Sequence, residues 1–168
     1  MTSTDVLVDA FECIRDVVHP AVNGLTPDEL AFRPSGESNS IAWLVWHLTR
    51  IQDDHVAGLD GGEQVWTEKG WIDRFALPLD PTDTGYGHDP DTVAAVIADA
   101  SSLLGYFENV HERTLDFIRS LTEADLDRVV DRSWDPPVTV SIRLVSVIAD
   151  DLQHAGQAAY VRGILQRL

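Results

Sequence analysis

The sequence has few of the features that mark exported or membrane-bound proteins. Cys13 is its only cysteine, so no disulfide can form within the chain, and no basic segment followed by an apolar run stands at the amino end. The longest strongly apolar stretch, Ile41–Leu48, is far shorter than the roughly 20 residues that a membrane-spanning helix needs. These absences predict a cytoplasmic protein that has no membrane partner.

Positive charge is also scarce. Twelve Lys and Arg residues stand against 28 Asp and Glu residues, which gives a formal net charge of −16 at pH 7. A field of this sign repels phosphate backbones and anionic lipid surfaces, so nucleic acid is excluded as an expected partner. The chain has 168 residues, 44% of them hydrophobic, which is enough for one sizeable core. We therefore expect a single domain over residues 1–168.

The chain does contain clear helical periodicity. Apolar residues recur at steps of three and four, which predicts long helices over residues 4–19, 41–57, 89–120 and 139–168. Pro20 and Gly24 are expected to end the first of these helices, and Gly58 is expected to end the second. Shorter helical turns are predicted after Thr26 and Thr122, where capping residues stand in equivalent places between two long helices. Because no segment shows convincing strand alternation, we predict an all-α four-helix bundle.

The connection over residues 59–88 has no sustained period but contains several aromatic residues. Connections of this length within a compact domain are usually functional or disordered, and aromatic side chains have apolar area to bury. One interpretation makes this segment a wall for a second substrate, with Trp71 and Tyr86 as apolar surface and Arg74 neutralising an anionic group. In the other interpretation, the aromatic residues attach the segment to the bundle.

The last predicted helix has an apolar row that is interrupted by a carboxylate and an imidazole. Asp150 and His154 lie one turn apart, so their side chains can converge on one point. An unpaired buried carboxylate is costly, so this placement requires a partner. The main core stripe of the same helix is predicted to contain Val145, Ile148, Leu152, Ala155 and Ala159.

The predicted second helix offers such a partner in His47, which shares a face with Trp43 and Ile51. If the two helices are neighbours, His47, Asp150 and His154 form a two-histidine, one-carboxylate set of the kind that binds a metal and leaves a position open. His47 could instead be a hydrogen-bonded core residue. Asp151 could be the inward carboxylate, and Asp54 lies about two turns beyond His47 on the same face.

Several of these segments resemble the DinB superfamily of metal-binding four-helix bundles, and the resemblance covers nearly the whole chain. It is carried by His47 within Ile41–Leu48, by Arg33-Pro34-Ser35-Gly36 before it, and by His154-Ala155-Gly156-Gln157 near the carboxyl end. The resemblance implies metal ligands at His47, Asp150 and His154. Two positions depart from the family pattern, because Asp150 stands where glutamate or histidine is usual and Ala155 stands where arginine is common.

The resemblance also implies a function. Members of the superfamily resemble thiol S-transferases that use bacillithiol, mycothiol or glutathione, and they include a thiol-dependent isomerase. The implied cofactors are a divalent metal, zinc first and nickel second, and a low-molecular-weight thiol that reacts with a small electrophile. The abundance of arginine and the single lysine, Lys69, are typical of high-GC coding and favour mycothiol. Alternatives are a metal-dependent hydrolase on the same residues and a non-catalytic bundle with a degenerate metal site.

The remaining candidates have supporting or structural roles. Asp54 and Gln157 are predicted to support the ligands from outside the metal's own shell. Cys13 is predicted to be a small buried residue of the first helix, because it has no basic sequence neighbour that would activate it. A homodimer is predicted from the apolar surface of Trp43, Trp46 and the last helix. Four histidines are predicted to lie outside the site: His19, His55, His88 and His111.

Overall fold

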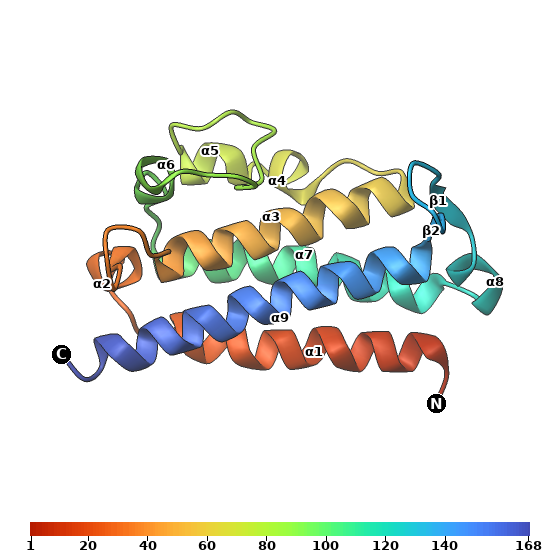
Figure 1. The fold of residues 1–168 in the computed structure, drawn as a ribbon, viewed down its shortest axis with the longest axis horizontal. Helices are drawn as coiled ribbons and strands as arrows, with labels where there is room; N and C mark the ends of the chain where they lie inside the picture. Colours follow the sequence, from red (N-terminus) through yellow and green to blue (C-terminus); the bar gives the residue numbers. More distant parts are fainter.

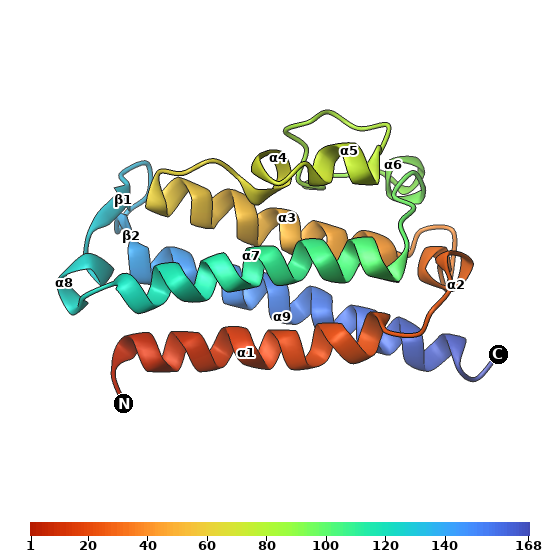
Figure 2. The same ribbon diagram turned by 180° about the vertical axis from the view of Figure 1, so that it is seen from behind.

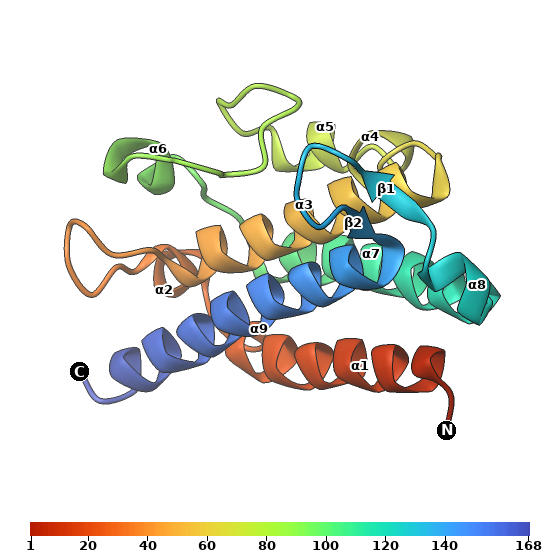
Figure 3. The same ribbon diagram turned by 45° about the vertical axis from the view of Figure 1, so that its right-hand side comes forward.

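The computed structural model describes all 168 residues, and four long helices dominate it. They are α1 (Ser3–Val22), α3 (Ile41–Asp60), α7 (Ala100–Ser120) and α9 (Val140–Leu165). Each packs against two others in the ring order α1, α9, α3, α7, so α1 and α3 face each other diagonally. Figure 1 and Figure 3 show α3 and α9 side by side and running in opposite directions. The predicted all-α four-helix bundle is confirmed.

Short helices join the long ones. α2 (Pro27–Ala31) follows α1, and α8 (Glu123–Leu126) follows α7. Both begin at the predicted capping boxes, in which Thr26 and Thr122 accept a backbone N–H of the first turn. Three more, α4 (Val65–Glu68), α5 (Trp71–Phe75) and α6 (Pro90–Ala94), lie on the long connection that covers the outer side of α3 (Figure 2).

A two-stranded antiparallel sheet lies between α8 and α9 and was not predicted. Its strands are β1 (Val129–Asp131) and β2 (Val138–Thr139), with Val129 opposite Thr139 and Asp131 opposite Val138. Strands of two or three residues are too short to show alternation in the sequence, which explains why the pattern did not predict them.

Three predicted helix boundaries are wrong. Pro20 lies inside α1, which continues to Val22, because a proline in the last turn removes only one hydrogen bond of the helix. α3 passes Gly58 and ends at Asp60, and the next residue, Gly61, has a φ of 77°, which gives the left-handed cap that glycine favours. The predicted helix over 89–120 is divided, because the Asp99 side chain accepts the Ser102 N–H and starts a new helix, α7.

The core stripe of α9 differs from the predicted one. Val145 and Leu152 are exposed, and the buried row contains Leu144, Val147, Asp151 and Ala155. Because α9 has apolar residues around most of its circumference, its sequence fits two stripes about 100° apart equally well. The predicted burial of Cys13 is also wrong. Its side chain is exposed, because Phe11 and Ile14 occupy the inner face of α1.

The two tryptophans expected to support a dimer are also buried. Trp43 and Trp46 pack in the core, whereas α9 presents exposed apolar side chains at Ile142, Val145, Leu152 and Tyr160. A homodimer therefore stays a prediction that rests on α9 alone. No helix of this protein combines the length and the apolar composition that crossing a membrane would require.

Candidate metal centre

The structure brings together the three residues that the sequence singled out. His47 comes from the first half of α3, and Asp150 and His154 come from the middle of α9. One ligand atom from each lies within 4.8 Å of the other two. The two imidazoles meet edge to face, with ring centroids 4.7 Å apart and planes at 74°. The predicted convergence of these helices at His47 is therefore confirmed.

Hydrogen bonds identify which ring nitrogen of each histidine is free. The Nδ1 of His47 lies 2.5 Å from the carbonyl oxygen of Thr84, and the Nδ1 of His154 lies 2.8 Å from the carbonyl oxygen of Asp150. A carbonyl oxygen only accepts, so both Nδ1 atoms carry the proton. In the neutral rings the lone pairs are then on Nε2. Fixing a histidine in this way is the usual preparation of a metal ligand.

The Asp150 carboxylate completes the group. Its Oδ2 is buried and has no hydrogen-bond partner, although it lies 3.4 Å from the Nδ1 of His154, whose N–H points to the backbone instead. A carboxylate with an orphaned oxygen and two imidazoles that each keep one free nitrogen form a donor set that suits a divalent cation.

The charges of the group influence one another. Burial lowers the pKa of His47, and the neighbouring His154 lowers it further, while the Thr84 hydrogen bond opposes both. Burial also lowers the pKa of His154, but the Asp150 carboxylate and carbonyl outweigh this effect and raise it overall. The pKa of Asp150 is lowered, because the two histidines outweigh the effect of burial. The carboxylate is therefore held in its anionic form, which is the form that binds a metal.

The spacing also fits a cation. Two atoms bound to one zinc ion at roughly 2.0–2.2 Å each lie at most about 4.4 Å apart, so a spread of 4.8 Å needs only small side-chain rotations. The group is open on one side. His47 is 5% exposed, whereas the side chains of His154 and Asp150 are 17% and 34% exposed. Solvent therefore reaches the α9 side of the group.

The alternative carboxylates lie elsewhere. Asp151 is fully buried in the core row of α9 and is not part of the group. Asp54 accepts a hydrogen bond from the Nε2 of Gln64 at 2.7 Å and lines a separate cavity. Gln157 is exposed and lines a groove with Leu44 and Tyr160. The supporting roles of Asp54 and Gln157 stay predictions.

The three predicted substrate-binding residues do not meet in one cavity. Trp71 is buried, donates from Nε1 to the side chain of Asn109, and its ring packs against Gly105 of α7. Arg74 lies over the Trp71 ring at 4.6 Å, and Tyr86 is 90% exposed. Trp71 therefore attaches the long connection to the bundle, and a role of these residues in substrate binding stays a prediction.

One residue of the site's surroundings was misjudged from the sequence. His88 was expected on the surface, but its side chain is buried and stacks on Trp46. Its Nε2 bonds the Asp83 carboxylate, and its Nδ1 accepts the indole N–H of Trp43. The Asp89-Pro90 helix start directly after His88 suggested an exposed position, and no sequence pattern indicated these partners. The other three histidines lie outside the group, as predicted.

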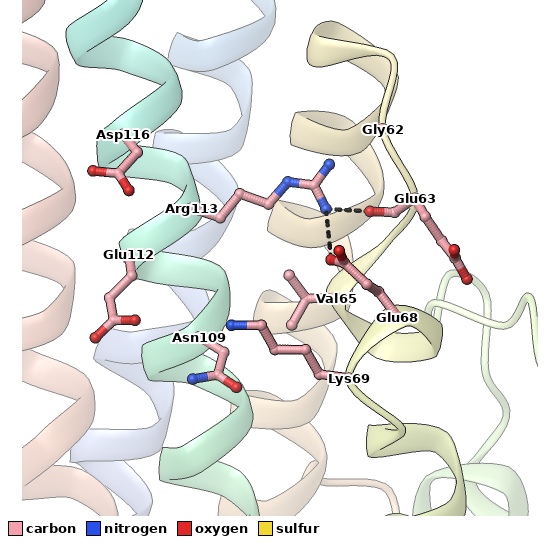
Figure 4. Close-up of a pocket in the computed structure, with 9 residues that line it drawn as sticks. All are labelled: Gly62, Glu63, Val65, Glu68, Lys69, Asn109, Glu112, Arg113 and Asp116. Carbon is pink, nitrogen blue, oxygen red and sulfur yellow. Dashed lines mark hydrogen bonds and ion pairs between the residues drawn. The ribbon is translucent and has the colours of Figure 1, made fainter.

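The largest cavity, about 440 Å³, lies between α7 and the segment that leads into α4 (Figure 4). Within it, Arg113 bonds the Asp60 carboxylate and the carbonyl of Glu63, and it lies 4.0 Å from Glu68. It contains no metal-binding group. We therefore place the functional site by its donor atoms and not by cavity size.

A bundle of four long helices with two histidines and a carboxylate on facing helices is an arrangement in which helical bundles can hold metal ions. Comparison with known proteins identifies the family. A sequence profile of the DinB superfamily matches residues 10–158, so the chain belongs to the DinB superfamily. The crystal structure of a conserved protein from Enterococcus faecalis superposes with a TM-score of 0.93 at 28% sequence identity, covering 100% of this chain and 99% of that one. A search of curated proteins finds no match.

Proposed function

We propose that this protein is a divalent-metal-dependent thiol S-transferase, or a thiol-dependent isomerase, in which His47, Asp150 and His154 hold the metal. One observation carries the proposal: one ligand atom from each of His47, Asp150 and His154 lies within 4.8 Å of the other two, and the carbonyl contacts of both histidines leave their Nε2 atoms free to bind. A divalent cation stabilises a thiolate over a thiol, which raises the population of the nucleophile at neutral pH.

The donor set favours zinc, with nickel as the second choice, because imidazole suits both metals and zinc readily takes two histidines and a carboxylate. The chain does not supply the thiol. Cys13 lies on the exposed side of α1, and α1 is diagonal to α3 in the bundle. The sulfur therefore has to come from a small molecule, and the coding bias of the sequence favours mycothiol.

A separate cavity of about 290 Å³ lies where residues of α3, β1 and α9 meet, and we propose that it receives the electrophile. It is lined by Asp54, His55, Gly58, Leu59, Val130 and Arg143. Arg143 precedes Asp150 by seven residues, so both lie on one face of α9 about two turns apart. Its guanidinium makes only one long contact, 3.4 Å to Asp131, and so has donors left for an anionic group. This cavity replaces the loop aromatics as the proposed place of the substrate.

The test is turnover of an electrophile such as chlorodinitrobenzene with and without added thiol. We expect turnover by the zinc-loaded protein to require a thiol, with mycothiol ahead of bacillithiol and glutathione. It should be lost in His154→Ala and retained in the remote variant His19→Ala. Thiol-independent hydrolysis of an activated ester, with no thiol-dependent turnover, would favour the hydrolase and contradict the proposal.

A further inference from the structure

Part of the long connection crosses directly over the metal ligand His47. This segment, Asp83–His88, is termed the strap here. The Thr84 carbonyl in the strap accepts the N–H of His47 Nδ1. On the other side, the Trp43 indole stacks on the same imidazole at 4.6 Å with an interplanar angle of 14°. The ring is therefore fixed by one hydrogen bond and one aromatic face.

The approach of the strap depends on a glycine. Gly85 has a φ of 92°, which L side chains rarely adopt. A Cβ at this position would lie 2.6 Å from His47 Nδ1 and 3.1 Å from the Trp46 ring. Gly87, two residues on, also has a positive φ of 76°, but a Cβ there would meet no atom within 4 Å. The two glycines share a backbone requirement, and only Gly85 touches the metal ligand.

The strap is also anchored to α3. The buried guanidinium of Arg50 donates from Nε to the Asp83 carbonyl at 3.0 Å and from Nη1 to Gln64 and Tyr106. The Asp83 carboxylate accepts the Gly85 N–H at 2.9 Å and bonds His88 at the same distance. Both ends of the strap are therefore held at fixed positions relative to His47.

We propose that the strap is a positioning element for the metal ligand: the Thr84 carbonyl keeps the proton of His47 on Nδ1, and Gly85 and Asp83 hold that carbonyl in place. The lone pair of His47 is then on Nε2, which is the nitrogen left to bind the metal. This inference rests on the proposed metal-binding function. It assigns Gly85 and Asp83 as positioning residues and gives the long connection a role other than substrate binding.

The experiment compares Gly85→Ala with Gly87→Ala, because an alanine at either position is strained by a positive φ but only the alanine at position 85 would meet His47. NMR of the imidazole nitrogens in metal-free protein reports the tautomer of His47, and chelator competition reports zinc affinity. We expect the Nδ1–H tautomer in the natural protein and in Gly87→Ala. Gly85→Ala should lose it and bind zinc roughly 10- to 100-fold more weakly than Gly87→Ala.

If Gly85→Ala fails to fold, Asp83→Ala and Asp80→Ala give the same comparison. Both aspartates accept a backbone N–H two residues on, but only Asp83 belongs to the strap. We expect Asp83→Ala alone to weaken zinc binding. An Nε2–H tautomer in the natural protein would overturn the inference. Equal zinc affinity of Gly85→Ala and Gly87→Ala would also overturn it, as would equal zinc affinity of Asp83→Ala and Asp80→Ala where that pair is used. Absence of zinc binding by the natural protein with the Nδ1–H tautomer intact would instead contradict the proposed function on which it rests.

Discussion

Asp150 and Asp151 are neighbours in sequence and have opposite environments. Asp150 lies at the candidate metal centre with two histidines and is partly exposed, whereas Asp151 is fully buried and neither of its oxygens has a hydrogen-bond partner. Burial raises the pKa of Asp151 well above its usual range, and the adjacent Asp150 charge adds to this effect. A 100° step along α9 thus separates a candidate ligand from an unsatisfied core residue.

Replacing Asp151 with leucine, which has nearly the same shape, should stabilise the fold. An unsatisfied buried polar group costs roughly 1–3 kcal/mol, so we expect Asp151→Leu to raise the free energy of unfolding by about that amount. Urea unfolding at neutral pH measures it, with Asp9→Leu on the exposed side of α1 as the control, which should change stability by less than about 0.5 kcal/mol. A large loss of stability in Asp151→Leu would show that this carboxyl group has a partner in solution.

Asp53 and Arg50 form the main buried charge network. The Asp53 carboxylate accepts the N–H groups of Val65 and Trp66 and the hydroxyl of Tyr106, and it lies 3.8 Å from the Arg50 guanidinium. Removing one member of such a network leaves a buried charge without compensation. We therefore expect Asp53→Ala to destabilise the protein by about 3–5 kcal/mol.

The adjacent Asp54 is the matched control for this prediction. Its carboxylate is 46% exposed and accepts one hydrogen bond, so Asp54→Ala should cost only about 0.5–1.5 kcal/mol in urea unfolding. Equal losses in the two variants would mean that the network around Asp53 does not hold the long connection to α3.

Asp99 makes the stability of the bundle depend on pH. Its carboxylate caps α7, and hydrogen bonds from the Ser101 hydroxyl and the Ser102 N–H lower its pKa. Since the folded-state pKa lies below the unfolded value of about 3.9, the contribution is complete above that value and is lost as the pH falls through the folded pKa.

Asparagine at this position caps equally well but does not titrate. Asp99→Asn should therefore be less stable than the natural protein by about 0.3–1 kcal/mol at pH 6, where the ionised carboxylate favours the helix N-terminus. The difference should shrink or reverse at pH 3. Urea unfolding at the two pH values tests this, and a difference that stays constant would contradict the assignment of Asp99 as an ionised cap.

The sequence predicted the features that local patterns encode. Helical periodicity gave four long helices, Thr26 and Thr122 gave two capped turns, and the spacing of Asp150 and His154 indicated a shared point with His47. The structure confirms all of these. The helices and the capped turns depend on side-chain identity at fixed steps along the chain. The meeting of His47 with Asp150 and His154 depends in addition on α3 and α9 being neighbours.

The sequence could not predict features that depend on rotation or on backbone contacts. α9 is apolar on most sides, so its core stripe was assigned to the wrong face and Asp151 was not recognised as buried. The contact between Thr84 and His47 uses a carbonyl group, which every residue has, so no residue type indicated it. The break before Asp99 was missed because Val96 and Ile97 continue the apolar period across it.

The most direct test of the account is the metal content of protein purified without chelators, measured by elemental analysis. We predict close to one zinc or nickel ion per chain in the natural protein and in His19→Ala, whose imidazole bonds Glu108 away from the centre. We predict almost none in His47→Ala, Asp150→Ala and His154→Ala. The same metal content in all five proteins would contradict the assignment of these three residues as ligands.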